Sequence, residues 1–199
     1  MNLTDDQLDR LRRLSKAWAD AEQALKIGEQ QLGDVVIPAI KELRYGGRKL
    51  AKALDNYQDG KDIERTDREV EDAIFDCYRA RHDATDAAAA ALSLHLDHAI
   101  KDLGIEAVKE HFPDYAKFAS LLLAVRRKIA DARQDQNGRH DLYEDLEADE
   151  LPQIVALYEE FKAAEPHMKD QRFWAWLQRL GINLGWLVAL AVAVFAIYK

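Results

Sequence analysis

Residues 180–198 read LGINLGWLVALAVAVFAIY, a run of nineteen residues without a charge in which only Asn183 is strongly polar. As a helix, this run covers about 28 Å, close to the thickness of the hydrocarbon core of a bilayer. A helix in a soluble core rarely needs apolar side chains on every side over such a length. We therefore predict a transmembrane helix over residues 180–199. The alternative is a hydrophobic helix buried inside a large assembly.

Small residues recur at every fourth position of this run. They are Gly181, Gly185, Ala189 and Ala193. This spacing places them on one nearly axial stripe of a helix, where the backbone of a second helix can approach closely. The stripe predicts self-association in the membrane. The competing interpretation is that glycine and alanine are simply common in membrane helices.

Aromatic and basic residues border the apolar run. The preceding stretch, 169–179, reads KDQRFWAWLQR. Its composition predicts an amphipathic membrane-proximal helix over 167–179, which either lies in the headgroup region or forms the first turns of a continuous helix. Pro166 is expected to separate this helix from the body. The predicted interface residues are Arg172, Phe173, Trp174, Trp176, Arg179, Trp186 and Tyr198.

The distribution of basic residues predicts an orientation. Residues 162–179 contain four basic side chains, whereas only Lys199 follows the apolar run. The positive-inside rule then leaves the N-terminal body in the cytoplasm. With a single residue beyond the span, insertion has to follow completion of the chain. We therefore expect a single-pass, tail-anchored protein with the lipid bilayer as its first partner.

Charge and cysteine content indicate which partners and which compartment suit the protein. Residues 169–199 hold four bases and one acid, a charge of +3, which leaves −11 for residues 1–168 out of a total of −8. An acidic body disfavours nucleic-acid binding, while the basic collar favours anionic headgroups. The single cysteine rules out an intramolecular disulfide, in agreement with a reducing cytoplasm. The first residues, MNLTDD, show no cleavable signal peptide.

Apolar residues in the body repeat every three or four positions, and no stretch alternates with period two. Thr4 is expected to cap a first helix, with apolar residues up to Leu32. Pro38 then either lies in the first turn of a second helix that begins at Asp34, or kinks one long helix. This second helical stretch should extend to about Tyr57 and stop at Asp59-Gly60.

Later helix boundaries follow from local signals. The sequence Thr66-Asp67-Arg68-Glu69 matches a capping box and predicts a helix from about Thr66 to Leu103, with Gly104 as its stop. Shorter helices are expected over 105–111, from Asp114 and around 142–146. Another helix should open at Leu151-Pro152. The predicted fold is all-α: an elongated, coiled-coil-like helical bundle over 1–166 in the cytoplasm, with one C-terminal transmembrane helix.

Catalytic signatures are missing from the sequence. No histidine has an acidic residue three positions before it, as a di-iron bundle requires, and His95 with His98 would need further ligands from elsewhere. Cys77 follows Ile74 on an apolar stripe, which favours a buried, inert thiol. No nucleophile elbow or dinucleotide fingerprint occurs. We therefore expect no enzyme activity, no cofactor and no functional metal.

A basic stripe is the one charged feature that could bind a partner. Its members, spaced three and four residues apart on one helical face, are Lys41, Arg44, Arg48 and Lys52. It either contacts an anionic partner or is an ordinary solvated face paired with acids on the next helix. The neighbouring Gly46-Gly47 indicates close packing, a hinge or a helix break. In an oligomer, the acidic run 144–150 of one copy could meet this stripe on another.

These features favour a non-enzymatic membrane protein that self-associates through its span and its helical body. It would act as a scaffold or adaptor, with a protein partner bound to the body. The alternative is an oligomeric effector that forms a pore or disrupts the bilayer. Against a wide pore, the span has no polar residue besides Asn183 that could line an aqueous channel.

Overall fold

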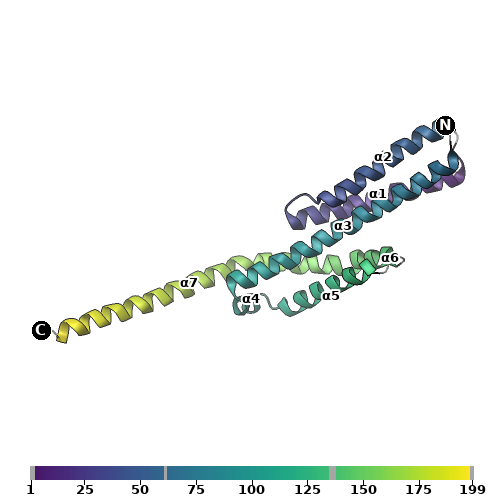
Figure 1. The fold of residues 1–199 in the computed structure, drawn as a ribbon. Helices are drawn as coiled ribbons and strands as arrows, with labels where there is room; N and C mark the ends of the chain where they lie inside the picture. Colours follow the sequence, from purple (N-terminus) through teal and green to yellow (C-terminus); the bar gives the residue numbers. More distant parts are fainter. Residues whose placement is uncertain (1–2, 61, 135–137, 198–199) are drawn as a thin grey trace. The chain divides into compact units, whose positions relative to one another are not determined.

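The structure is a computed structural model that describes residues 3–60, 62–134 and 138–197, without the side chains of 175, 179, 182–184 and 187–197. Within these ranges every regular element is helical, so the predicted all-α bundle is confirmed (Figure 1). The elements are α1 (Asp5–Leu32), α2 (Ile37–Asp59), α3 (Ile63–Leu103), α4 (Ile105–His111), α5 (Tyr115–Gln134), α6 (Arg139–Asp145), the π-helical turn η1 (Leu146–Glu150) and α7 (Leu151–Ile197).

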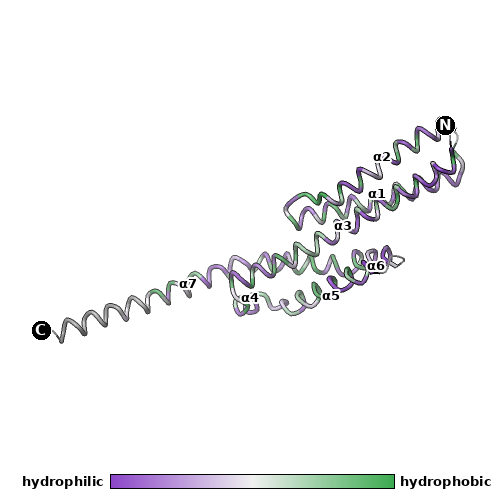
Figure 2. Tube along the Cα trace, in the orientation of Figure 1, coloured by the Kyte–Doolittle hydropathy of each residue, from purple (hydrophilic) through white to green (hydrophobic). Residues whose placement is uncertain are grey.

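The chain divides into two compact units. Unit 1 comprises residues 1–94 and 121–153, and unit 2 comprises residues 95–120 and 154–199. Helices α3, α5 and α7 therefore each contribute residues to both units. Figure 2 shows hydrophilic and hydrophobic positions alternating along α1 to α3, as expected of helices with one buried face.

The first helix begins where its cap was predicted. Thr4 Oγ1 accepts the Gln7 amide N–H at 3.3 Å, and Gln7 Oε1 accepts the Thr4 amide N–H at 3.0 Å. This reciprocal pair satisfies two amide donors that the helix itself leaves open. The helix ends at Leu32 because Gly33 adopts a left-handed conformation, with φ 71°.

The question of a break or a kink near Pro38 is resolved in favour of a break. Helix α2 starts at Ile37, three residues later than predicted, with Pro38 in its first turn, where the missing N–H has no helical partner to lose. It ends at Asp59, before the left-handed Gly60. Gly46-Gly47 lies inside α2, so the glycine pair does not break the helix.

The predicted start of α3 at Thr66 is wrong by one turn. The helix begins at Ile63, because Asp62 caps it: Asp62 Oδ1 accepts the Arg65 amide N–H at 3.4 Å. Asp62 has φ 42°, a conformation that aspartate tolerates better than most residues. Thr66 is then fully buried inside the first turns. The predicted stop before Gly104 and the helix over 105–111 are confirmed.

The core of unit 1 is built from small side chains that let α1, α2 and α3 approach one another. Alanine dominates the cluster, together with Leu14, Leu43, Tyr57, Val70 and Ile74. Two glycines set the closest approaches. A Cβ on Gly28 would lie 2.8 Å from the Ala84 carbonyl oxygen, and one on Gly46 would lie 3.3 Å from the Ala73 carbonyl oxygen. Close packing is thus the reason for glycine at position 46.

Aromatic rings fill the core of unit 2. The ring of Phe112 lies 5.9 Å from that of Phe118 and 5.6 Å from that of Phe161, both in edge-to-face geometry. Ile154, Leu157 and Met168 of α7 are also buried. The predicted inner-face residues Phe118, Leu122, Val125 and Ile129 of α5 are buried as expected, whereas Tyr115 and Leu121 are half-buried.

Pro166 does not separate the membrane-proximal segment from the body. Helix α7 is continuous from Leu151 to Ile197, with Pro166 inside it. Proline removes one backbone hydrogen bond and crowds the preceding turn, at a cost of about 3 kcal/mol. Phe161 and Met168 are buried on either side of it, while Pro166 itself is exposed. Packing on both sides therefore outweighs the local cost and keeps the helix intact.

Candidate functional site

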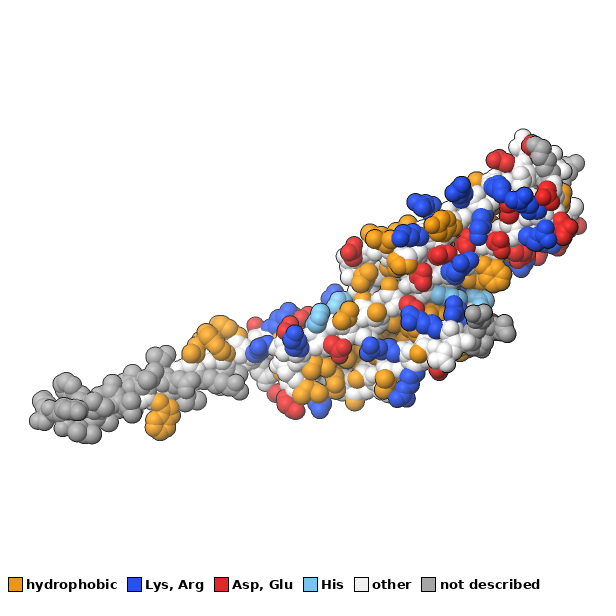
Figure 3. All heavy atoms as spheres, in the orientation of Figure 1, with side chains coloured by type: hydrophobic (Ala, Val, Ile, Leu, Met, Phe, Trp, Pro, Cys, Tyr) orange, Lys and Arg blue, Asp and Glu red, His pale blue; other side chains and the backbone are white. Residues whose placement is uncertain are grey.

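Exposed aromatic side chains form the most conspicuous surface of α7. Phe173, Trp174, Trp176 and Trp186 are 56%, 63%, 56% and 74% exposed. Figure 3 shows hydrophobic side chains projecting from this part of α7. The ring centroid of Phe173 lies 6.1 Å from that of Trp174 and 6.3 Å from that of Trp176. We call Phe173, Trp174 and Trp176 the aromatic surface.

Helix α7 is hydrogen-bonded to α4 immediately before the aromatic surface. Gln171 Nε2 donates to Glu110 Oε2 at 3.0 Å, and Gln171 Oε1 lies 2.8 Å from His111 Nε2. Both partners belong to α4. Met168, one turn earlier, is fully buried. The aromatic surface therefore begins within one turn of the last contacts that hold α7 against its unit.

Basic side chains accompany the aromatic surface. Arg172 is exposed next to Phe173, and Lys169 pairs with Glu165 at 2.8 Å, one turn back along α7. The side chains of Arg179 and Tyr198, two further predicted interface residues, lie outside the described residues. Tryptophan combined with basic residues is the composition found where helices meet lipid headgroups. Fully burying one such aromatic side chain contributes about 1.5–3 kcal/mol.

The predicted span is only partly covered by the structure. Gly181 and Gly185 are exposed, and a Cβ on either would meet no atom within 4 Å. The side chains of Ala189 and Ala193 lie outside the described residues. Of the helices searched over those residues, none combines the length and the apolar character needed to cross a membrane.

The basic stripe divides into two parts. Lys52 pairs with Glu69 of α3 at 2.5 Å, and its neighbour Lys49 pairs with Asp76 at 2.7 Å, as the interpretation of an ordinary paired face requires. In contrast, Lys41, Arg44 and Arg48 are exposed and form no ion pair within the described ranges. Arg44 lies over the ring of Tyr45, 5.7 Å from its centroid.

Acidic side chains of the run 144–150 form ion pairs with basic residues of the same chain. Arg81 Nε donates to Glu147 Oε2 at 2.7 Å, and Thr85 Oγ1 donates to Glu147 Oε1 at 2.7 Å. Arg81 also pairs with Glu144 at 3.4 Å, and Lys128 pairs with Glu150. Glu144, Glu147 and Glu150 thus link α6 and η1 to α3 and α5, whereas Asp145 and Asp149 of the same run are exposed. A contact between this run and the basic stripe of a neighbouring copy stays a prediction.

Sequence reasoning missed a histidine–tyrosine layer between α3 and α6. His82 stacks on Tyr143 with ring centroids 4.0 Å apart, and His140 stacks on Tyr78 at 3.9 Å. Tyr143 Oη donates to Asp86 at 2.6 Å. His82 is buried, and neither ring nitrogen has a hydrogen-bond partner. The aromatic-rich spacing of four between Tyr78 and His82 was the available signal.

Burial controls the protonation of this layer. Desolvation, helped by His140, Arg139 and Arg81, lowers the pKa of His82 to about 3. The ring is therefore neutral at physiological pH. Burial also raises the pKa of Glu147, although its hydrogen bonds from Thr85 and Arg81 oppose that shift.

Cys77 is buried as predicted. Its thiol has no exposed surface, and burial raises its pKa to about 12, which makes it a poor nucleophile. Among the described residues, no group of three or more histidine, cysteine, aspartate or glutamate side chains is arranged to hold a metal ion. His95 instead accepts or donates a hydrogen bond with Tyr158 Oη at 2.6 Å from Nδ1.

Comparison with known proteins adds no further constraint. No protein-family model, no curated protein and no solved structure matches this chain. The function has therefore to be inferred from the residues and their geometry.

Proposed function

We propose that this chain is a non-enzymatic, single-pass membrane protein that self-associates and presents its helical body as a scaffold or adaptor. The observation that carries the proposal is the aromatic surface on α7: three large rings are exposed to solvent, directly before the apolar run 180–198. A soluble protein seldom exposes so many clustered aromatic side chains without a partner.

Lipid is the partner that fits this surface best. Indole and phenyl rings beside Arg172 and Lys169 match the headgroup region, where one part of a side chain is apolar and the other is wet. Residues 180–199 would then enter the hydrocarbon core. The excess of basic residues before the span supports a cytoplasmic body.

Self-association is the second part of the proposal. The open faces of Gly181 and Gly185, in register with Ala189 and Ala193 in the sequence, support close contact between spans of neighbouring copies. Further contacts between bodies would complete the assembly. The acidic body makes nucleic acid an unfavourable partner.

Flotation on lipid vesicles tests the membrane assignment. The full-length chain should float with vesicles, and a Val188→Arg, Leu190→Arg variant should remain at the bottom of the gradient, because each buried charge at mid-span costs about 2.5–3.5 kcal/mol. Phe75→Arg is the matched control, since Phe75 is an exposed aromatic residue of unit 1. Equal flotation of all three proteins, or of none, would contradict the proposal.

The mass of the detergent-extracted protein tests self-association. Gly185→Leu fills the small-residue stripe and should dissociate an oligomer formed through it. A monomer in both samples would exclude that interface.

Dye release from lipid vesicles distinguishes a scaffold from an effector. The aromatic surface would also suit an effector that disrupts bilayers. Vesicles that leak with the full-length chain, but not with a chain that lacks residues 180–199, would favour this alternative function.

A further inference from the structure

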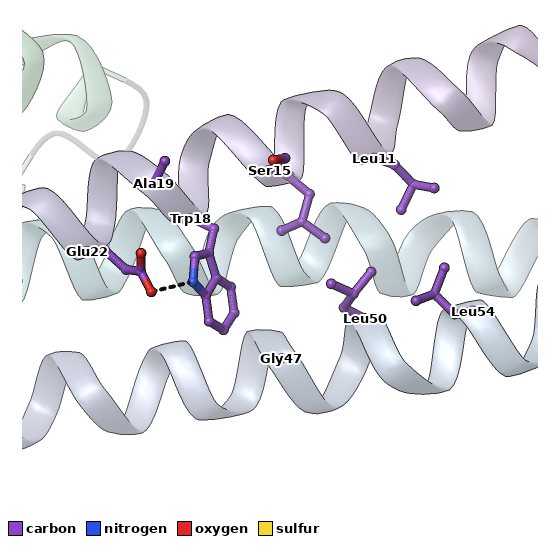
Figure 4. A pocket seen from close by; sticks show the side chains of 9 residues that line it. Leu11, Ser15, Trp18, Ala19, Glu22, Gly47, Leu50 and Leu54 are labelled. Atoms are coloured by element: carbon purple, nitrogen blue, oxygen red, sulfur yellow. Dashed lines mark hydrogen bonds between the residues drawn. The ribbon is translucent and has the colours of Figure 1, made fainter.

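The two units carry hollows with different linings. In unit 1, the groove between α1 and α2 is lined mainly by apolar side chains, among them Trp18 (Figure 4). The indole Nε1–H donates to Glu22 Oε1 at 3.0 Å, and a Cβ on Gly47 would lie 3.1 Å from the ring. Glycine at position 47 therefore makes room for Trp18. In unit 2, a smaller hollow between α3 and α7 brings side chains of both charges together.

The size and lining of the unit 2 hollow suit a small polar ligand. Its volume is about 200 Å³, below the range of about 300–1,000 Å³ that holds drug-sized ligands. All residues that line it belong to unit 2. Its charged and imidazole side chains are His95, His98 and Asp102 of α3 and Lys162, Glu165 and Lys169 of α7.

Lys162 and the two histidines form the cationic pole of this hollow. Lys162 Nζ lies 5.6 Å from the centroid of the Tyr158 ring, and Tyr158 Oη lies 2.6 Å from His95 Nδ1. Burial lowers the pKa of His95, Lys162 and His98 lower it further, and Glu165 opposes the shift. The ring is therefore neutral near pH 7.

The buried tyrosine favours one tautomer of the neutral ring. Burial raises the pKa of Tyr158, so its hydroxyl stays protonated and can donate to His95 Nδ1. The proton of the imidazole then lies on Nε2, which forms no hydrogen bond within the ranges that the structure describes. The cationic pole thus offers an anion the Lys162 ammonium group and an imidazole N–H donor.

Asp102 and Glu165 form the acidic pole. They follow His98 and Lys162 by four and three residues, and α3 and α7 run in the same direction here, so both acids lie toward the same end of the hollow (Figure 1). Four residues of helix correspond to about 6 Å. Glu165 pairs with Lys169 at 2.8 Å. Asp102 is exposed and pairs with no cation whose side chain the structure describes.

Opposite poles one helical turn apart favour a ligand that itself carries both charges. Lys162, like Asp102, forms no ion pair in the described part of the chain, so each can accept an external partner. A simple anion gains at Lys162 and is repelled by Asp102, and a simple cation meets the reverse. A molecule with an ammonium group and an anionic group on a short carbon chain gains at both poles.

We infer that this hollow binds a small soluble zwitterion. Its phosphate or carboxylate group would lie at Lys162 and the histidines, and its primary ammonium group at Asp102. The inference goes beyond the proposed function and does not depend on the membrane assignment, because every residue that it uses precedes the aromatic surface.

The headgroup of phosphatidylethanolamine carries the same two groups, but it fits the order of the poles poorly. Along α7, Glu165 of the acidic pole lies between Lys162 and the aromatic surface. A lipid in the membrane would therefore meet the acidic pole first. In this lipid, however, the phosphate group and not the ammonium group adjoins the acyl chains, so a soluble ligand is the better occupant.

Binding is measured by NMR on the full-length chain in an uncharged detergent. The reporter is the imidazole signal of His98, which is assigned by its loss in His98→Gln. The probe is phosphoethanolamine, and ethanolamine and inorganic phosphate represent its two halves. Phosphoethanolamine should bind more tightly than either half by about fivefold or more, because each half leaves one pole without a partner.

Two substitutions at exposed side chains locate the probe. Lys162→Gln should weaken the binding of phosphoethanolamine and of inorganic phosphate by about fivefold. Asp102→Asn should weaken the binding of phosphoethanolamine but not that of phosphate. The matched controls are Lys101→Gln and Asp97→Asn, at exposed residues of α3 that do not line the hollow, and they should change neither affinity.

Equal affinities for phosphoethanolamine and inorganic phosphate would overturn the inference, because the ammonium group would then contribute nothing. A His98 signal that no probe shifts would also overturn it, as would equal effects of Lys162→Gln and Lys101→Gln. Nanodiscs distinguish the source of the ligand. A shift of the His98 signal in phosphatidylethanolamine but not in phosphatidylcholine, without free probe, would identify the lipid as the ligand and overturn the assignment to a soluble molecule.

Discussion

The helices of the two units pack through side chains of opposite size: small ones in unit 1 and large aromatic ones in unit 2. Unit 1 brings helix backbones together over alanine and glycine, so that Gly28 leaves no room for even a methyl group beside Ala84. Unit 2 holds its helices apart with Phe112, Phe118 and Phe161. The first arrangement fails when a side chain grows, and the second fails when one shrinks.

The largest effect is expected from emptying the aromatic core. Phe161→Ala should lower the free energy of unfolding of unit 2 by about 3–5 kcal/mol, because it removes a buried ring and leaves a cavity. Amide hydrogen exchange in α4 reports the loss. Phe75→Ala, at an exposed ring, is the control and should change stability little. Unaltered exchange in Phe161→Ala would mean that the rings do not hold unit 2 together.

Overfilling the small-residue core should have the next largest effect. Gly28→Leu should destabilise unit 1 by about 1–3 kcal/mol, since its side chain would collide with the α3 backbone at Ala84. Exchange of α1 amides measures this. Gly33→Leu is not a suitable comparison because of its left-handed conformation, so Ala19→Leu, at an exposed site on α1, serves instead. Similar exchange in the two variants would refute close packing at Gly28.

Acidification should destabilise unit 1 through the buried side chain of His82. The pKa of His82 is about 3 in the folded chain against an ordinary value near 6.5, so the unfolded chain takes up the proton first as pH falls. The contribution of His82 to the free energy of unfolding is therefore at its full value above about pH 6.5 and declines below it. The free energy of unfolding should fall by about 1.4 kcal/mol between roughly pH 7.5 and 5.5.

The replacement His82→Phe keeps a ring against Tyr143 and removes the titration. Urea unfolding of the parent chain at both pH values should show the decline, and the variant should show a smaller one. A decline of the same size in both proteins would assign the pH dependence to other groups.

The smallest effect is expected at the paired end of the basic stripe. Lys52 forms its ion pair with Glu69 at the surface, where such pairs contribute about 0–1 kcal/mol. A double-mutant cycle with Lys52→Ala and Glu69→Gln measures the coupling between the two side chains. A coupling well above that range would mean that charge, and not only small-residue packing, holds α2 against α3.

Local signals in the sequence predicted most helix ends. Thr4, Gly60 and Gly104 act through a few neighbouring residues, so their roles could be inferred without a fold. The start of α3 was misplaced because two capping signals, at Asp62 and Thr66, lie within one turn, and only the geometry of Asp62 decides between them.

Features that depend on distant residues could not be predicted. The role of Gly28 rests on Ala84 and that of Gly47 on Trp18, each from another helix. The continuity of α7 through Pro166 rests on the burial of Phe161 and Met168. Likewise, the lowered pKa of His82 depends on its burial and on the neighbouring His140, Arg139 and Arg81. The sequence predicted Phe173, Trp174 and Trp176 as interface residues, and the structure shows their rings exposed. Their contact with a membrane stays a prediction.

The unbroken α7 also has a mechanical consequence. Its 47 residues form a rod of about 70 Å, and a helix transmits tension along its hydrogen bonds without a slack segment. A pull on the C-terminal part of this rod would first strain the hydrogen bonds of Gln171 with Glu110 and His111. It would next strain the packing of Phe161 against Phe112. Unit 2 is thus the first part of the protein to bear force.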